Sequence, residues 1–482
     1  MYDLIVIGDD LSSHVAAAVA TRYGLSTALI AESGLGDTFI IGDYVYNLDP
    51  TPITGMGSNQ TLLSLFAELD IEPIERDGLL LNPAYQVILP KHRIDFFSDQ
   101  ESLVSEMERE FPQLEIEINK FYDYTMKYSA VFSQWLRNHP FVQIRSIRDF
   151  GNYLKIIPNL IRHKLKAKKF NQILISNPSL KKVWEAQQAL LSFSTINQHS
   201  FSSSFIYSAP LRGIFYFDQG KQILFNALIK KIESTGGTYM SSCEISAIEK
   251  GRLINVDVTD KDGVLSKITA RKMIVSSKWT GMPLLTGHSK KINITDLLRP
   301  VKITSYPFTL HLGVSKKCFP EKTARHIAVV CDVDRDIHDH NLIILHLSIP
   351  QEHDGISESK ISMTATVFLP NDSEVWTREN LKAQAESMID RLEFFLPFLK
   401  ENIELVDIDK SIDIHNECRQ IVNPKYQVSN SFFTGFAAKN NKTRFGNIYL
   451  SGASLLTDAG FEGEIISGIN AASKVLTVEK SS

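Results

Sequence analysis

The chain has 482 residues, which is too long for one ordinary domain, so two domains are expected. Its hydrophobic content of 43% and charged content of 22% are those of a globular protein, and the net charge of −4 argues against a general nucleic-acid binder. No run of 18 or more apolar residues is present that could cross a membrane as a helix.

The N-terminal residues predict a strand, a helix and a second strand. Leu4–Ile7 is a continuous apolar run, typical of a strand buried on both faces of a parallel sheet. Helix N-cap residue types follow, then an alanine-rich helix that ends at Gly24. A second apolar strand over 26–31 is closed by Glu32, so the segment predicts a dinucleotide-binding βαβ unit with an acid for a ribose hydroxyl.

The glycine fingerprint of this unit is incomplete. The pattern G-x-G-x-x-G would begin at Gly8, but Asp10 and Ser13 stand at its second and third glycines. A carboxylate about 4 Å from a phosphate charge would repel it by roughly 4 kcal/mol at an effective dielectric constant of about 20. In the alternative interpretation, Asp9 or Asp10 caps its own helix and fills the phosphate's place.

The middle of the chain holds two kinds of segment. Residues 97–200 are expected to be mostly helical, and 301–370 contain four strand-like runs followed by a helix capped by Thr377. Between them, 220–276 predicts a helix and strands that belong with the N-terminal unit.

A basic stretch lies within the helical segment. Residues 155–182 combine lysines and arginines with apolar residues at helical spacing, which predicts either contact with an anionic membrane surface or an ordinary solvated face. Aromatic residues are not interleaved with the charges, so no nucleic-acid partner is expected.

Cysteine and acidic patterns predict no metal site. The four cysteines are scattered without a C-x-x-C pair, and no secretory signal is recognised at the N-terminus, so a cytoplasmic protein with reduced cysteines is expected. The acidic stretch 332–340 begins like a calcium loop but has Ile337 and Ile343 at the required glycine and glutamate positions.

The C-terminal stretch 447–468 carries the most information. A short apolar strand stops at Gly452, and a helical pattern begins at about Phe461, just after Gly460. A helix N-terminus offers unpaired N–H groups and a partial positive charge, and the glycines allow a ligand to approach the backbone.

These motifs resemble those of phytoene-desaturase-type members of the amine-oxidase flavoprotein superfamily. The residues that match that family's C-terminal motif in register are Asn447, Tyr449, Leu450, Gly452, Ala453, Ala459, Gly460, Gly463, Ser467 and Gly468. The stretches 46–52, 213–220 and 236–248 also resemble segments of the family, so the similarity reaches both ends and the centre of the chain.

The resemblance implies an α/β fold, with a Rossmann-like FAD/NAD(P)-binding domain and an interleaved α+β substrate domain. It assigns 1–95, 213–300 and 425–482 to the cofactor domain, and 96–212 and 301–424 to the substrate domain.

The resemblance also assigns cofactor roles to single residues. Gly8 would open the pyrophosphate loop, Glu32 would bind the adenosine ribose, and the backbone of Ile245 would contact adenine. Gly452 lies in the matching motif, and the helix start at Gly460 and Phe461 would lie against the flavin ring. Asp10 and Ser13, which replace glycines, count against FAD.

Two functions follow from these patterns. The first is an FAD-dependent oxidoreductase that transfers hydride on an apolar, lipid-like substrate; the sequence identifies no catalytic residue, since the flavin supplies that chemistry. The second is a flavin-free binding protein on the same scaffold that holds a lipid or a lipidated partner. A cytoplasmic protein is expected in both cases, with peripheral membrane contact if the basic stretch 155–182 is a membrane face and not a solvated one.

Overall fold

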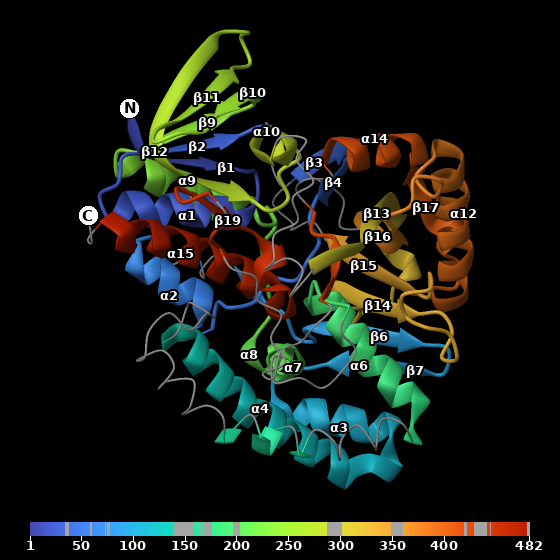
Figure 1. The fold of residues 1–482 in the computed structure, drawn as a ribbon. Coiled ribbons are helices and arrows are strands. Elements are labelled where there is room, and N and C mark those ends of the chain that lie inside the picture. The colour runs from blue at the N-terminus through green and yellow to red at the C-terminus, as the bar shows by residue number, and fades with distance from the viewer. Residues whose placement is uncertain are drawn as a thin grey trace.

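Two large sheets organise the chain (Figure 1). The computed structural model describes residues 1–33, 38–57, 60–72, 74, 78–138, 158–159, 161–163, 165–166, 176–195, 203–286, 301–348, 360–418, 422–428, 441–443 and 445–479. The α/β fold class expected from the sequence is confirmed.

The first sheet takes strands from three distant stretches of the chain. Its order is β10-β11-β12-β1-β2-β9, and β19 pairs with the end of β12. The strands are β1 (Tyr2–Ile7), β2 (Thr27–Ala31), β9 (Thr238–Ser241), β10 (Glu244–Glu249), β11 (Ile254–Thr259), β12 (Leu265–Ser276) and β19 (Ile448–Ser451). Strands β9, β2, β1, β12 and β19 run parallel, whereas β10 and β11 form an antiparallel extension.

Both faces of this sheet are buried, as the apolar run in β1 predicts. Leu4 and Val6 face a core shared with helices, while Ile5 and Ile7 face a second core that contains Trp279. The helices on the first face are α1 (Leu11–Arg22), α2 (Thr61–Glu68), α9 (Gln222–Ser234) and α15 (Gly460–Glu479). Figure 1 shows α1 and α15 lying against each other beneath the sheet.

The second sheet has the order β17-β13-β16-β15-β14-β6-β7, with β18 paired to β13. Its strands are β6 (Tyr85–Leu89), β7 (His92–Phe96), β13 (Val301–Ser315), β14 (His326–Val330), β15 (Leu342–Ser348), β16 (Lys360–Pro370), β17 (Ile403–Val406) and β18 (Lys425–Val428). One face is covered by α12 (Arg378–Phe395), α13 (Leu399–Asn402) and α14 (Ile408–Cys418), and the other by α3 (Gln100–Glu110), α4 (Glu115–Asn138) and α6 (Pro178–Leu191).

Short elements connect the two sheets. They are β3 (Thr38–Ile41), β4 (Tyr44–Asn47), β5 (Leu79–Leu80), β8 (Phe215–Tyr216), α7 (Ser203–Tyr207), α8 (Ala209–Arg212) and α10 (Met282–Thr286). Helix α8 leads to β8, so the chain passes between the two sheets near residues 209–216.

The strand pairing differs from the sequence-based boundaries at two places. The sequence predicts a cofactor domain of 1–95, 213–300 and 425–482, whereas β6, β7 and β18, which lie within the first and last of these ranges, pair within the second sheet. Strand β6 pairs in parallel with β14, more than 200 residues away, through Ile327 and Val329 opposite Gln86 and Ile88. No local pattern in 85–95 distinguishes a partner in one sheet from a partner in the other.

Half of the basic stretch 155–182 lies outside the described residues. Within its described part, Lys182 is buried and its amine lies 3.0 Å from Glu185, so this lysine is not on an exposed basic face. Ile161 and Leu165 are exposed apolar residues. Across the described ranges, no helix combines the length and apolar character needed to cross a membrane.

Candidate functional site

The turn between β1 and α1 is filled by the side chain of Asp10. Asp10 is the N-cap of α1, and its carboxylate accepts the backbone N–H of Ser13 at 3.1 Å and the Ser13 hydroxyl at 2.6 Å. The hydroxyls of Ser12 and Ser276 donate to the same carboxylate at 3.0 and 2.7 Å. Asp10 thus accepts four hydrogen bonds and is 2% exposed. Its carboxylate occupies the position of a phosphate at a helix N-terminus and bonds to the N–H group that the phosphate would use.

The space beside Gly8 is also occupied. Gly8 has φ of +149°, and a Cβ built on it would lie 2.5 Å from the Ser13 Oγ and 2.6 Å from the Ser276 Cβ. In a dinucleotide loop, bare glycines leave such space for the pyrophosphate. Here Ser13 and Ser276 fill the space instead.

Asp9 and Glu32 use their carboxylates within the protein. Asp9 accepts the backbone N–H of Ser33 at 2.8 Å and its hydroxyl at 2.9 Å, and burial raises the pKa of Asp9 to about 6. Glu32 accepts the backbone N–H of Ile245 at 3.1 Å and the indole N–H of Trp279 at 2.6 Å. Glu32, the predicted ribose acid, and Ile245, the predicted adenine contact, are therefore hydrogen-bonded to each other.

The C-terminal half of the predicted site keeps its backbone shape. Gly452 has φ of +123° and its N–H donates to the Ser467 hydroxyl at 3.0 Å, and Gly460 has φ of +55° at the start of α15. Phe461 is only 3% exposed, and the Lys221 amine lies 5.3 Å from its ring centre. The helix start exists as predicted, but buried side chains surround it.

The side chain of Glu462 occupies the space beside the start of α15. Its carboxylate lies 2.7 Å from a guanidinium nitrogen of Arg212 and accepts the Thr61 hydroxyl at 2.7 Å. The same side chain covers Gly55, where an added Cβ would lie 2.9 Å from the Glu462 Cδ. The first turn of α15 is thereby tied to α2 and α8.

These residues do not fit FAD in this arrangement. The groups expected to hold its pyrophosphate, ribose and adenine already satisfy one another, and a phosphate would have to displace the Asp10 carboxylate. We therefore derive no chemical step through the flavin.

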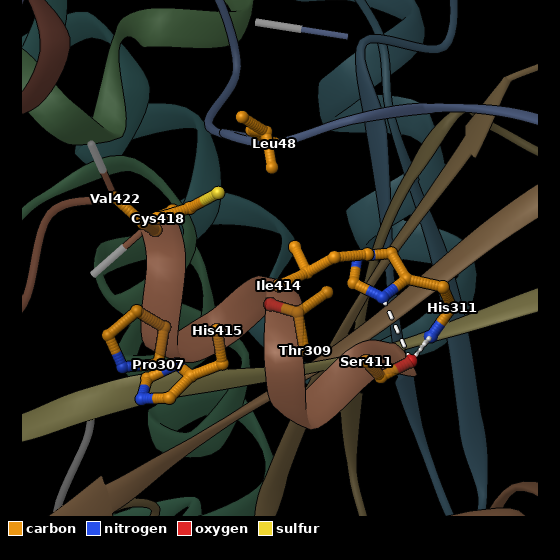
Figure 2. Close-up of a pocket in the computed structure, with 9 residues that line it drawn as sticks. All are labelled: Leu48, Pro307, Thr309, His311, Ser411, Ile414, His415, Cys418 and Val422. Carbon is orange, nitrogen blue, oxygen red and sulfur yellow. Dashed lines mark hydrogen bonds between the residues drawn. The ribbon is translucent and has the colours of Figure 1, made fainter. Parts of the chain in front are cut away.

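Two adjoining hollows lie at the second sheet and share Pro307 and Val422. Figure 2 shows the first, which lies between β13 and α14. Its lining is Leu48, Pro307, Thr309, His311, Ser411, Ile414, His415, Cys418 and Val422. In Figure 2 His311 and Ser411 face each other, with the imidazole Nδ1 3.0 Å from the hydroxyl.

This histidine–serine pair is not arranged as a base and a nucleophile. The Ser411 hydroxyl donates to the Asp407 carbonyl at 3.0 Å, and it accepts the His311 backbone N–H at 3.2 Å. Burial lowers the pKa of His311 to about 3, so its ring is neutral and its Nδ1–H donates to the hydroxyl oxygen. The pair fixes α14 against β13.

The second hollow is mostly apolar with a few polar groups. Its lining is Asp49, Pro50, Thr51, Pro52, Ala189, Leu190, Phe193, Pro307, Ile344, Thr366, Phe368, Val422, Asn423 and Lys425. Asp49 is ion-paired with the buried Lys221 at 2.5 Å; burial alone would raise the pKa of Asp49, but Lys221 and Thr51 hold it below its usual value. Apolar walls with few polar groups are typical of small-molecule sites.

The eight residues predicted for the site fall into three groups, which have internal partners. Gly8, Asp10 and Ser13 meet at one turn, and Glu32 meets Ile245. Gly460 and Phe461 begin α15, and Gly452 bonds to Ser467 of the same helix. Sequence reasoning missed three polar groups of the second hollow, Asp49, Asn423 and Lys425. No motif surrounds Asn423 and Lys425, and the resemblance of the stretch 46–52 gives Asp49 no role. It also missed Trp279 and Ser276, which lie at the end of β12 where that strand meets the turn.

Among the described residues, no group of three or more histidine, cysteine or acidic side chains is placed to hold a metal ion. All four cysteines are free, and three of them are buried.

Comparison with solved structures shows what the fold is similar to. An oxidoreductase from Methanosarcina mazei matches at 12% identity with a TM-score of 0.57, covering 99% of this chain and 100% of that one. Putrescine oxidase bound to putrescine matches at 13% identity with a TM-score of 0.52, covering 99% of both chains. The PF1083 protein from Pyrococcus furiosus matches at 12% identity with a TM-score of 0.56, covering 98% of this chain and 97% of that one.

The chain has the fold of these three proteins. The likeness is one of fold, so the amine-oxidase superfamily and its phytoene-desaturase-like subtype stay predictions. No protein-family model matches the chain, and no curated protein matches it.

Proposed function

We propose that the chain is a flavin-free binding protein built on an oxidoreductase fold, and that it holds an apolar molecule in the two hollows at the second sheet. One observation carries the proposal: the Asp10 carboxylate accepts four hydrogen bonds where a pyrophosphate would bind. The loop that defines a dinucleotide site is thus satisfied by the protein's own side chain.

Electrostatics supports the same conclusion. Asp10 lies in a region that also holds the buried acids Asp49 and Glu464, whose charges act on one another. Burial raises the pKa of Glu464; the charges of Asp10 and Asp49 add to this rise, whereas those of Lys278 and Lys221 oppose it. A pyrophosphate at about 4 Å from one such carboxylate would be repelled by roughly 4 kcal/mol at an effective dielectric constant of about 20.

The lining of the hollows favours an apolar ligand. Leu190, Phe193, Ile344 and Phe368 supply apolar surface, and Ile414 does so in the first hollow. A lipid-like small molecule fits this chemistry, and the lipid chain of a lipidated partner would present the same surface.

A second candidate function is favoured by the fold comparison. An FAD-dependent oxidoreductase, with hydride transfer on an apolar, lipid-like substrate as in phytoene desaturases, agrees with matches that span nearly the whole chain. It also agrees with the retained backbone at Gly452 and Gly460. For this function, Asp10 would have to turn away and release its serine partners.

One titration separates the two functions. We would record the absorbance spectrum of the purified protein and titrate FAD into the wild type, Asp10→Gly and Asp10→Asn, following flavin fluorescence. The flavin-free proposal predicts no flavin in the wild type and a gain in affinity of at least about tenfold for Asp10→Gly, since each 1.4 kcal/mol is tenfold. Asp10→Asn removes the charge but keeps the bulk, so it should gain less.

Stoichiometric flavin in the wild type, with affinity unchanged in both variants, would refute the proposal and favour the oxidoreductase. Ligand binding is tested separately, by extracting the purified protein with organic solvent and titrating it with a fluorescent fatty acid. Ile414→Trp should fill the hollow of Figure 2 and weaken binding of that probe, whereas Phe394→Trp, at an exposed position on α12, should not.

A further inference from the structure

Lys425 is a buried lysine whose amine lines the second hollow. It begins β18 and is 3% exposed. Its amine donates to the carbonyl oxygen of Ser192 at 2.6 Å and to that of Ala189, at the end of α6. The ring of Phe368 lies 4.6 Å from the amine nitrogen.

This set of partners matches the neutral amine. A neutral amine has two N–H groups and one lone pair, and two carbonyl oxygens accept the two N–H groups. An ammonium ion carries a third N–H and a full charge, which needs further acceptors or a carboxylate when it is buried. The carboxylate that lines the same hollow, Asp49, is already paired with Lys221 at 2.5 Å.

Ionisation follows this environment. Burial lowers the pKa of Lys425 from 10.5 to about 7, and the charge of Asp49 offsets this only in part. The charge of Lys425 also acts on His338, whose pKa burial lowers as well. A large fraction of Lys425 is therefore a free amine near neutral pH, which is the nucleophilic form used by Schiff-base lysines.

A second polar group in the hollow has no partner. Asn423 is 4% exposed and lines the same hollow, and its Nδ2 donates to Glu464 at 2.9 Å. Its Oδ1 is buried without a hydrogen-bond partner, although buried acceptors are normally satisfied. An unpaired amide oxygen and an amine that line the same apolar hollow indicate a ligand that brings its own hydroxyl or N–H group.

We propose that Lys425 forms a reversible imine with an apolar aldehyde or ketone held in the second hollow. The amine nitrogen adds to the carbonyl carbon, giving a carbinolamine whose hydroxyl Asn423 Oδ1 can accept. The C–O bond then breaks and a C=N bond remains, and the oxygen leaves as water with the two amine hydrogens. No oxidant or reductant is needed. This inference rests on the proposed ligand-binding function and names the class of ligand.

The alternative role for Lys425 is structural. A cation at the C-terminus of α6 would be stabilised by the helix dipole and would only hold β18 in place. That role predicts a charged, unreactive amine, so chemical trapping distinguishes the two.

The test is reductive trapping on the full-length protein. We would incubate it with decanal and sodium cyanoborohydride at pH 7 and locate the decyl adduct by peptide mass spectrometry. The neutral fraction of an amine of pKa about 7 exceeds that of an ordinary lysine roughly a thousandfold at pH 7. Lys425 should therefore be modified at least about tenfold faster than any other lysine, with a rate that rises with pH through about 7.

Lys272 is the matched internal control, since its amine also donates to a helix carbonyl, that of Val475 at 2.9 Å, but it lines neither hollow. Decanol, which cannot form an imine, should compete with labelling of Lys425 and leave surface lysines unaffected. Lys425→Arg should abolish the adduct; if that variant fails to fold, the wild-type competition still decides. Labelling spread over surface lysines with Lys425 spared would overturn the imine, and if the fluorescent fatty acid still bound, the binding function would stand without it.

Discussion

The ion pair between Arg212 and Glu462 allows a quantitative test of whether the space beside the start of α15 is closed to solvent. The side chains are 11% and 1% exposed, and the closest nitrogen and oxygen lie 2.7 Å apart. At an effective dielectric constant of about 20, that distance corresponds to an attraction of roughly 6 kcal/mol before desolvation is subtracted. Breaking a buried pair by removing one partner typically costs about 3–5 kcal/mol.

We expect Glu462→Met to lower the free energy of unfolding by about 3–5 kcal/mol, because it leaves the Arg212 charge buried without its carboxylate. Arg212→Met should cost at least as much, since the guanidinium also lies 3.7 Å from the Phe205 ring centre and donates to the Phe205 carbonyl. The double variant should recover part of the loss, giving a coupling energy of at least about 2 kcal/mol.

The assay is a double-mutant cycle by urea denaturation, with hydrogen exchange in the first turns of α15 to locate the change. The control cycle uses Lys267 and Glu249, whose side chains are 50% and 63% exposed at 3.2 Å, and where coupling below about 1 kcal/mol is expected. If the coupling energy of Arg212 and Glu462 were no larger than that of the control pair, and hydrogen exchange in α15 were unchanged in the variants, the space beside the start of α15 would be open to solvent. That result would refute the closed site.

Four further outcomes are expected. Asp9→Asn should raise stability at pH 7 and flatten the pH dependence of stability between about 4 and 6. The pKa of Asp9 is raised to about 6 in the folded protein, so its stabilising contribution is present below 3.8 and is lost as the pH rises through about 6. Urea denaturation curves that do not change across that range would contradict this. Lys425→Met should weaken the pH dependence of the melting temperature between 7 and 10, since the lowered pKa of Lys425 gives stability that is present above 10.5 and lost as the pH falls through about 7. Gly460→Ala should lower the free energy of unfolding by at least about 3 kcal/mol in a urea titration, because the new Cβ would lie 1.9 Å from the Leu191 carbonyl oxygen. Gly236→Ala, also at positive φ but with no atom within 4 Å of the new Cβ, should lower it by about 1 kcal/mol. If 155–182 contacts membranes, the protein should co-sediment with anionic vesicles and less so in high salt; equal recovery with neutral vesicles would favour the solvated face.

Local signals in the sequence were enough to predict much of the fold. The apolar run at Leu4–Ile7 became β1, Gly24 ends α1 at a φ of +87°, and Thr377 caps α12 by accepting the backbone N–H of Asn380. Asp10 as an N-cap was one of two interpretations of the same turn, and it is the one that the structure contains. These features depend on residues within a few positions of one another, which is why a sequence reveals them.

Side-chain partners far apart in the chain could not be predicted in the same way. Trp279 is 247 positions from Glu32, and Arg212 is 250 positions from Glu462. A tryptophan or an arginine carries no mark in the sequence that says which carboxylate it will meet. The placement of β6 beside β14 has the same origin, because only the assembled sheet decides that pairing.

The retained glycines of the C-terminal motif have a reason to be glycine that does not involve a cofactor. A Cβ on Gly452 would lie 2.2 Å from the Ser277 Oγ, and one on Gly460 would lie 1.9 Å from the Leu191 carbonyl oxygen. Both also have positive φ, which other residues rarely adopt. The motif is therefore required for packing β19 and α15 against their neighbours, and it predicts the fold whether or not FAD binds. The turn at Asp10 differs, because there the fingerprint glycines would serve the ligand, and a binding protein that no longer holds a pyrophosphate is free to replace them with Asp10 and Ser13.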